Sequence, residues 1–323
     1  MKCKMHAAVS LAATLALTSA AIFAQQWPAK AVRVVVPFAP GGTTDAQARI
    51  LAKKYTDSLG QSFVVENRIG ASGMIGTDAV ARGPADGYTL LFTSSALSVN
   101  ATLFAGKFKF DPVKDLAPVI WTSSVPLVLT LHPSVPAKNV KELIELSKRQ
   151  KGGLNGGHNG SGTTSHIALE MLSQFTGTKL EAIPYKGGGP TTIALLAGEI
   201  DICFSTLTTV KPHIDTGRLR GLAVTTRKPS SILPGLPTMD SMYRGFESDN
   251  WFALFVPTNT SKDIVAKLHG LAVDALKSPE LREMIARDGG DVVASSLEAL
   301  GAHLRSEIER YAKVIRAGNI KPE

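Results

Sequence analysis

Short apolar stretches rich in β-branched residues alternate with stretches of helical periodicity along most of this chain. The predicted strands are Val32–Phe38, Phe63–Asn67, Tyr88–Thr93, Val125–Leu131, Ala182–Pro184, Ile200–Phe204, Leu219–Thr225 and Trp251–Val256. The predicted helices between them include Val140–Gln150, Thr163–Phe175, Ile193–Ala197 and Asp263–Leu276. Strands and helices in alternation predict an α/β fold with mostly parallel sheets covered by helices.

The beginning of the chain has a different character. Lys2 and Lys4 precede the apolar run AAVSLAATLALTSAAIFA, which ends in small residues. This pattern is typical of a secretory signal peptide, and it is too short and too weakly hydrophobic for a membrane anchor. We therefore expect residues 1–24 to be a signal peptide cleaved after Ala24, with Ala21 as the alternative, and the mature protein to be exported to the periplasm.

The remaining length, about 300 residues, exceeds what one core comfortably holds, so two domains are expected. Two segments are candidate crossings between them: Trp121–Pro126 and the proline-rich Thr226–Pro237. These crossings predict a discontinuous lobe 1, residues 25–124 with 228–323, and a lobe 2, residues 125–227. A double chain crossing makes a hinge, with a cleft between the lobes in which a ligand can bind.

Charge and cysteine content exclude several classes of protein. Without Lys2 and Lys4, 33 of the 35 basic residues remain against 27 acidic ones. This small surplus is spread thinly, without the basic arm or aromatic ladder of nucleic-acid binders, so no nucleic-acid partner is expected. A mild positive field suits the capture of small anions. Only Cys203 remains after processing, so an intrachain disulfide is not possible.

The first strand leads into a glycine-rich turn where a helix is predicted to begin. Helix starts bind anions, because their first N–H groups have no partner within the helix. The candidate ligand-binding residues of this turn are Phe38, Ala39, Pro40, Gly41, Gly42, Thr43, Thr44 and Asp45. Thr44 and Gln47 have the spacing of a capping box. For Asp45 we favour bonding to loop amides at the helix start over direct contact with a ligand.

A second turn of the same kind follows in lobe 2. Its candidate ligand-binding residues are His158, Asn159, Gly160, Ser161, Gly162, Thr163, Thr164 and His166. Tyr185, Lys186 and Gly187 form a third turn, and Ser205 and Thr206 end the following strand. Lys186 is equally consistent with a ligand-binding cation and with an exposed surface lysine. For His166 we favour a structural hydrogen-bonding role, and for Trp251 core packing.

The same residues do not fit the common catalytic patterns. A nucleotide P-loop needs a lysine directly before the helix hydroxyl, and the dinucleotide fingerprint occurs at neither turn. Around Ser161 the glycines are immediate neighbours, which a hydrolase elbow does not have. His158 and His166 lack the spacing and acidic partners of a zinc site. We therefore expect a binding protein without catalytic residues, metal or cofactor.

Many longer stretches resemble the Bug, or tripartite tricarboxylate transporter receptor, family of periplasmic solute-binding proteins. They include WPAKAVRVVVPFAPGGTTDAQAR, VVENRIGASGMIGTDAVARGPADGYTLL, LHPSVPAKNVKELI, GSGTTSH, IPYKGGGP, GRLRGLAVTT and AGNIKPE. The resemblance implies a two-lobed periplasmic-binding-protein (Venus flytrap) fold that closes over a carboxylate and delivers it to membrane permease subunits. It implies that the turn Phe38–Asp45 grips a ligand carboxylate, and that His158–Thr164 and the PYKG turn form the opposite wall.

The chain also departs from the pattern it resembles. Family members often carry small residues at the positions of His158 and Asn159, and an acid at the position of Ser205. The ligand therefore stays open among dicarboxylates, tricarboxylates, acidic amino acids and aromatic acids. We expect a monomer. Two alternatives are an exported enzyme that uses His166 or Lys186 as a base, and a sensor that presents its closed form to a membrane kinase.

Overall fold

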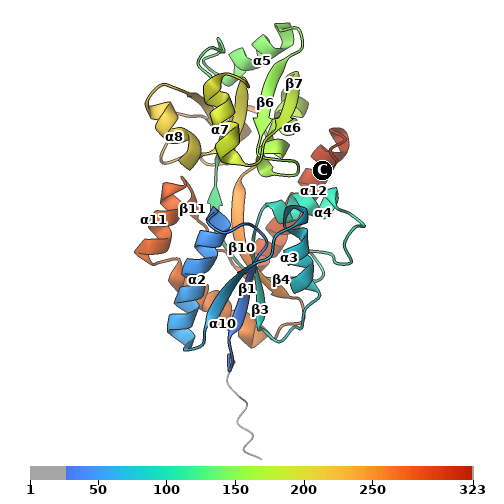
Figure 1. The fold of residues 1–323 in the computed structure, drawn as a ribbon, viewed down its shortest axis with the longest axis vertical. Helices are drawn as coiled ribbons and strands as arrows, with labels where there is room; N and C mark the ends of the chain where they lie inside the picture. Colours follow the sequence, from blue (N-terminus) through green and yellow to red (C-terminus); the bar gives the residue numbers. More distant parts are fainter. Residues whose placement is uncertain (1–26, 322–323) are drawn as a thin grey trace, which may run out of the picture.

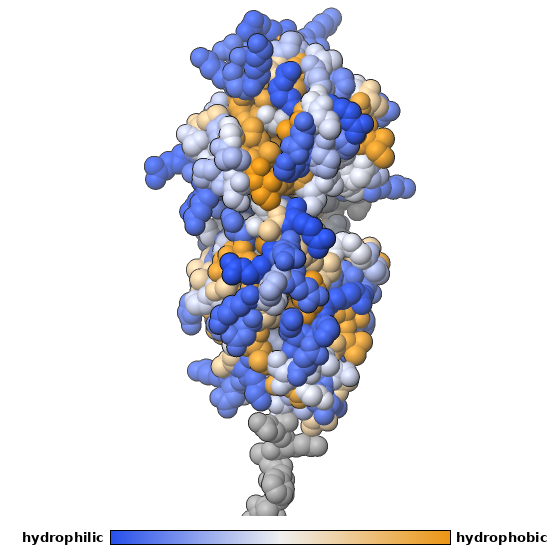
Figure 2. Space-filling model, turned by 90° about the vertical axis from the view of Figure 1, so that its left-hand side faces the viewer, coloured by the Kyte–Doolittle hydropathy of each residue, from blue (hydrophilic) through white to orange (hydrophobic). Residues whose placement is uncertain are grey.

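The computed structural model describes residues 27–321, so the predicted signal peptide lies outside the described residues. Two sheets form two α/β lobes, which lie one above the other along the long axis of the molecule (Figure 1). We call the part built on the six-stranded sheet lobe 1 and the part built on the five-stranded sheet lobe 2. Figure 2 shows one face of the molecule, on which hydrophilic residues surround apolar patches on both lobes. No helix within residues 27–321 has both the length and the apolar character needed to cross a membrane.

The sheet of lobe 1 has the strand order β11-β4-β10-β3-β1-β2. Its strands are β1 Val32–Val36, β2 Phe63–Asn67, β3 Thr89–Ser94, β4 Leu116–Val125, β10 Asn250–Pro257 and β11 Asp291–Val292. The helices of this lobe are α2 Thr43–Leu59, the 3-10 helix η1 Ala71–Gly73, α3 Met74–Ala81, α4 Ala96–Leu103, α10 Lys262–Ala275, α11 Pro279–Arg287 and α12 Leu297–Ala317.

Apolar residues on both faces of this sheet explain its two layers of helices. Val32, Val34 and Val36 of β1 pack in one cluster with residues of α2 and α10. Val35 points to the opposite face, because side chains alternate along a strand, and it packs with Leu300 of α12. A strand buried on both faces reads as a run of consecutive apolar residues, which is how Val34–Val36 appear in the sequence, whereas Arg33 of the same strand is exposed.

The sheet of lobe 2 has the strand order β7-β6-β8-β5-β9. Its strands are β5 Leu127–Leu131, β6 Leu154–His158, β7 Leu180–Pro184, β8 Ile202–Thr206 and β9 Arg220–Val224. Its helices are α5 Val140–Arg149, α6 Thr164–Thr176, α7 Gly188–Ala197, α8 Leu207–Asp215 and the short α9 Met239–Met242. Leu129, Ile167 and Phe204 are fully buried in the core between this sheet and α5 and α6.

Both sheets are mixed, so the expectation of mostly parallel sheets is wrong. In lobe 1, β1 pairs in parallel with β2 and β3, whereas β10 is antiparallel to β3 and β4. In lobe 2, β6 pairs in parallel with β7 and β8, whereas β5 is antiparallel to β8 and β9. The physical reason is that β5 and β10 directly follow the chain crossings, so each of them enters its sheet from the other lobe.

This strand order aims both sets of parallel strands at the gap between the lobes. The chain passes from β4 to β5 between Val125 and Leu127, so β4 runs toward lobe 2. By the pairings above, β1, β2 and β3 run in the same direction as β4. By the same argument β6, β7 and β8 run toward lobe 1. The carboxyl ends of both sets, where α/β proteins bind ligands, therefore face one another.

The second crossing lies later in the chain than the predicted Thr226–Pro237. Met239 and Phe246 are fully buried in the core of lobe 2, and Phe246 packs against the rings of Phe175 and Phe204. Pro237 O also accepts a backbone bond from Val224 N at the end of β9. The proline-rich segment is therefore anchored to lobe 2, and the chain returns to lobe 1 between Phe246 and β10.

Helix α12 adds a third connection between the lobes. It packs against β4 and α4 of lobe 1, and its last turns reach α6 of lobe 2 (Figure 1). Tyr311, Val314 and Ile315 belong to the core cluster of lobe 2, and Gln174 Nε2 donates to Val314 O at 3.0 Å. Residues 228–323, which were expected in lobe 1, therefore contribute to both cores.

The packing of Phe246 predicts a large effect of its removal on stability. Phe246→Ala should lower the free energy of unfolding by about 3–5 kcal/mol, because it leaves a cavity in the core of lobe 2. Met242→Ala is the matched control, since Met242 lies in the same segment with a 40% exposed side chain, and it should cost less than about 0.5 kcal/mol. Urea denaturation measures both values. Equal effects would contradict the late crossing.

Candidate functional site

The turn between β1 and α2 presents the beginning of a helix to the gap between the lobes. The first backbone bond of α2 runs from Ala46 N to Gly42 O, so the N–H groups of Thr43, Thr44 and Asp45 precede the helical ladder. Ala39, Pro40, Gly41 and Gly42 are exposed, whereas Thr44 and Asp45 are buried beneath them. The turn therefore has the geometry of an anion-binding helix start.

Asp45 holds this turn in shape. Its Oδ2 accepts from Gly41 N at 3.0 Å and from Arg49 Nε at 2.9 Å, and its Oδ1 accepts from Asn67 Nδ2 at 2.9 Å. Asn67 Nδ2 also donates to Phe38 O at 3.0 Å. Although burial opposes ionisation, hydrogen bonds from Arg49, Gly41 and Asn67 outweigh it and lower the pKa of Asp45. These contacts fit the helix-start role that the sequence favours.

The two glycines of the turn have different conformations. Gly41 has a φ of 86°, in the left-handed region that side chains rarely adopt. Gly42 has a φ of −79°, and a Cβ atom there would meet only Ala39 O, at 3.9 Å. The backbone conformation at position 41 therefore favours glycine, whereas the lack of a side chain at Gly42 leaves open space beside the first turn of α2.

The predicted capping box at the beginning of α2 is wrong. Gly42 is the N-cap residue, and no side chain caps the helix. Gln47 Oε1 instead accepts from the hydroxyls of Thr122 and Ser123 of β4, at 3.1 and 3.0 Å. Gln47 is buried against β4, and its amide oxygen pairs with hydroxyls of residues that are 75 and 76 positions away in the sequence.

The turn between β6 and α6 has a similar arrangement. Gly160 and Gly162 have φ values of 116° and 73°, and Thr163 caps α6 by accepting from His166 N. The rings of His158 and His166 are buried and stack with their centroids 4.0 Å apart. His166 Nδ1 accepts from Gly162 N at 3.3 Å, which is a structural role within the turn.

The remaining predicted residues lie at the same edge of the lobe 2 sheet. Tyr185 N donates to His158 O at 2.9 Å, which places the third turn beside the second. Lys186 is exposed, and Gly187 is the N-cap of α7. Ser205 is fully buried with its hydroxyl 3.2 Å from Cys203 Sγ, so the structure places it beneath the surface of the gap. Thr206 is the partly exposed N-cap of α8.

A cavity of about 360 Å³ lies between the lobes at the second turn. Lobe 2 contributes Asn159, Gly160, Ser161 and Thr163, and lobe 1 contributes Ala71, Ser72, Leu103 and Phe104. Phe38 of the first turn adjoins this wall, since a Cβ at Gly73 would stand 3.2 Å from its ring. The four lobe 1 residues were not predicted. A signal was present in RIGASGMIG, where Gly70 and Gly73 flank a turn in which Ala71 and Ser72 have positive φ.

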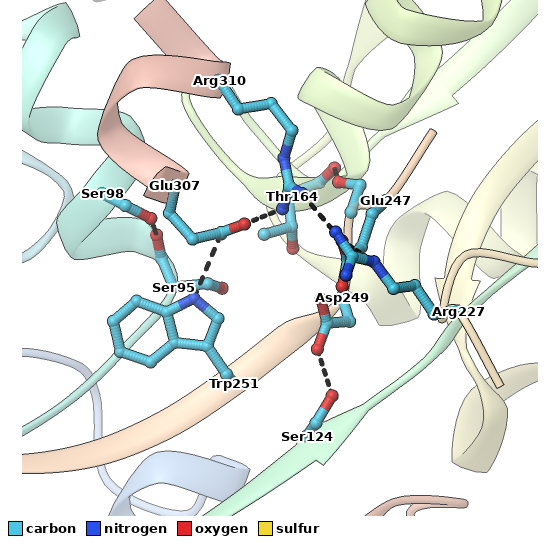
Figure 3. A network of polar contacts seen from close by, with 11 residues as sticks. Ser95, Ser98, Ser124, Thr164, Arg227, Glu247, Asp249, Trp251, Glu307 and Arg310 are labelled. Atoms are coloured by element: carbon cyan, nitrogen blue, oxygen red, sulfur yellow. Dashed lines mark hydrogen bonds and ion pairs between the residues drawn. The ribbon is translucent and has the colours of Figure 1, made fainter. Parts of the chain in front are cut away.

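A cluster of charged side chains joins the lobes beside the second crossing (Figure 3). Glu247 Oε2 accepts from Arg227 at 2.8 Å and from Arg310 at 2.9 Å, and Arg310 also pairs with Glu307. The indole N–H of Trp251 donates to Glu307 at 3.1 Å. The positive charges of Arg227 and Arg310 are therefore balanced by the negative charges of Glu247 and Glu307 where the lobes meet.

The next residues of the crossing segment contact both lobes. Ser248 Oγ donates to Thr164 O, at the beginning of α6, at 3.2 Å. Asp249 is 3% exposed and accepts from the hydroxyl of Ser124 on β4. Burial raises the pKa of Asp249, and the nearby Glu247 adds to the shift, while Ser124 and Arg310 oppose it. The crossing segment therefore links the second turn, at the beginning of α6, with the crossing strand β4 of lobe 1.

Two α/β lobes joined by paired crossing strands, with helix starts at the gap between them, define a two-lobed solute-binding protein. Comparison with known families gives the same class. A model of the tripartite tricarboxylate transporter family receptor matches residues 47–320, and the chain belongs to this family. Proteins of this family are solute-binding receptors and not enzymes.

Individual relatives extend over nearly the whole chain. Protein BugT of Bordetella pertussis is 36% identical over 98% of this chain and 98% of its own. A Rhodopseudomonas palustris structure with adipate is 34% identical and covers 92% of this chain and 100% of its own, with a TM-score of 0.78. The structure of MatC from Rhodopseudomonas palustris with bound malate is 28% identical and covers 90% of this chain and 100% of its own, with a TM-score of 0.75.

Asp249 predicts a specific dependence of stability on pH. Because its folded pKa lies above the ordinary value of 3.8, the folded state holds the proton more tightly, and this stabilising contribution is lost as pH rises. Asp249→Asn keeps a polar group at Ser124 without a charge, so its free energy of unfolding should fall less than that of the wild type between about pH 4 and about pH 7. Urea denaturation across this range measures the difference.

The matched control for this measurement is Asp274→Asn, which removes an exposed carboxylate of α10. Its curve shows what the loss of a surface carboxylate alone does to the stability. If the Asp249→Asn curve runs parallel to that of the wild type, the folded state does not hold the proton of Asp249 more tightly than the unfolded state does.

Proposed function

We propose that this protein is a periplasmic receptor that captures a small carboxylate between its two lobes and presents it to membrane permease subunits. The observation that carries the proposal is the pair of helix starts at α2 and α6, which lie at the carboxyl ends of strands aimed at one gap. In this proposal the ligand-binding residues are those of the turns 38–45, 158–164 with His166, and 185–187, with Ser205 and Thr206 behind them.

The first turn supplies main-chain donors rather than charged side chains. The positive charge of Arg49, which lies on α2 close after this turn, is already paired with Asp45. A carboxylate oxygen would reach the N–H groups of Thr43 and Thr44 across the open space beside Gly42. Main-chain donors of this kind bind carboxylates and phosphates alike. Because the charge of Arg49 is already neutralised, this turn offers no side-chain charge of its own to a multiply charged phosphate, which favours a carboxylate.

Relatives support the ligand class. The two solved relatives above were obtained with adipate and malate, both dicarboxylates. The cavity between the lobes has a volume in the range of small-molecule sites and suits compounds of this size. By the same relationship we propose export through residues 1–24, delivery to a tripartite transporter, and action as a monomer.

Calorimetric titration of the mature chain with a panel of carboxylates tests the proposal. We expect saturable binding of at least one compound at one site per chain, with the compound recovered unchanged after incubation. Small-angle scattering should show a more compact protein when the ligand is bound. Binding to none of the di-, tri- or amino-carboxylates in the panel would contradict the proposal.

Gly42→Val should separate binding from folding. The added side chain meets no protein atom closer than Ala39 O, so stability should change by less than about 1 kcal/mol. It would occupy the space through which a carboxylate reaches α2, so affinity should fall at least about tenfold. Titration with the best ligand of the panel and a thermal melt measure the two effects.

Gly270→Val is the control, because Gly270 lies on α10 with open space around it. Both variants carry the same substitution in the same lobe, and the control should bind like the wild type. Normal binding by Gly42→Val would show that the first turn is only a structural connection.

A further inference from the structure

Asn159 stands out among the residues that face the cavity between the lobes. It follows β6 directly and lines the cavity together with Ser161 and Thr163, opposite Ser72 and Phe104 of lobe 1. Its carboxamide lies against Gly188 at the beginning of α7, since a Cβ there would stand 3.5 Å from Asn159 Nδ2. The side chain is therefore held between the second turn and α7, beside the space for a ligand.

Hydrogen bonds within the turn occupy the neighbouring polar groups. Asn159 N donates to Ser165 Oγ at 3.0 Å, and Thr163 Oγ1 donates to Gly160 O at 2.7 Å. The side-chain oxygen of Asn159, in contrast, is buried and has no hydrogen-bond partner among residues 27–321. This oxygen can only accept a hydrogen bond.

A second acceptor of the same kind lies on the opposite lobe. Asn100 of α4 is fully buried, and its Nδ2 donates to Ser72 O at 2.9 Å. Its Oδ1 has no partner within the described chain and lies against Gly162, where a Cβ would stand 2.9 Å away. Both lobes therefore present a buried amide oxygen near the same turn.

We propose that Asn159 selects carboxylates that also carry a hydrogen-bond donor, a hydroxyl or an ammonium group, over carboxylates whose carbon chain is unsubstituted. The inference rests on the proposed function and adds a substrate class to it. A hydroxyl or ammonium group would donate to Asn159 Oδ1. A methylene group would leave this oxygen unpaired, and a second carboxylate would place lone pairs against it.

Binding sites built to pair with a ligand hydroxyl discriminate strongly against the analogue that lacks it, because the buried polar group of the protein is then left unpaired. Succinate, malate and aspartate form a matched set, since they share a four-carbon dicarboxylate chain. Malate adds a hydroxyl and aspartate adds an ammonium group. The comparison also distinguishes the two kinds of donor.

The experiment is calorimetric titration of the wild-type chain and of two Asn159 variants with these three compounds. We expect the wild type to bind malate or aspartate at least about tenfold more tightly than succinate. Asn159→Leu, similar in size without an acceptor, should reduce the ratio to less than about threefold. Asn159→Asp keeps an acceptor, so it should preserve the ratio even if every affinity falls because of its charge.

Asn155→Leu is the matched control, because Asn155 is an exposed residue of β6, the strand that directly precedes Asn159. It should leave the ratio unchanged. Equal wild-type affinity for succinate and for both substituted compounds would overturn the inference while leaving the proposed function in place, and so would a preference that survives in Asn159→Leu. Failure of the wild type to bind any carboxylate would overturn the proposed function and this inference with it. The comparison of the three affinities of the wild type does not depend on whether any variant folds.

Discussion

The first turn of an α-helix carries backbone N–H groups that the helix itself cannot pair, and this constraint organises the site. Helices α2 and α6 both begin at the carboxyl ends of parallel strands, where the two sheets face each other. An anion can then be bound without a lysine or arginine committed to it. Asp45 does not oppose this, because Gly41, Arg49 and Asn67 already satisfy its carboxylate. Its negative charge shapes the turn rather than repelling the ligand.

The same arrangement needs two lobes that keep a defined orientation. The crossing strands alone give a flexible hinge, whereas α12 reaches from one core into the other. Buried charges are costly unless they are paired, and here Arg310 pairs with both Glu307 and Glu247 where the lobes meet. Ser248 ties this cluster to the beginning of α6, so the orientation of the lobes and the position of the second turn depend on each other.

Local patterns in the sequence were sufficient for the elements that form the first turn. The apolar run before Pro-Gly-Gly predicted β1, although the strand ends at Val36 rather than Phe38.

The start of α7 in lobe 2 was harder to predict. This helix begins at Gly188, five residues before the predicted Ile193, because Gly-Gly-Pro disfavours a helix interior but is tolerated in the first turn of a helix. Propensity alone does not reveal such a start.

Other features depend on contacts between residues far apart in the chain. Thr44 and Gln47 have the spacing of a capping box, but the amide oxygen of Gln47 instead accepts hydrogen bonds from the hydroxyls of Thr122 and Ser123. The proline-rich stretch after β9 has the composition of a linker, yet Phe246 anchors the segment that follows it in lobe 2. The lobe 1 wall of the cavity comes from η1 and the end of α4, where the glycines of RIGASGMIG indicate a turn but not that it faces lobe 2. These features are set by tertiary packing, which local sequence does not record.

In the proposed complex both helix starts contact one ligand, and amide hydrogen exchange tests this most directly. The measurement compares exchange in peptides covering residues 38–46 and 158–165, with and without a saturating carboxylate identified by titration. We expect slower exchange at both turns in the bound protein, because their N–H groups become paired and enclosed. Protection confined to one turn, or located away from both, would contradict it.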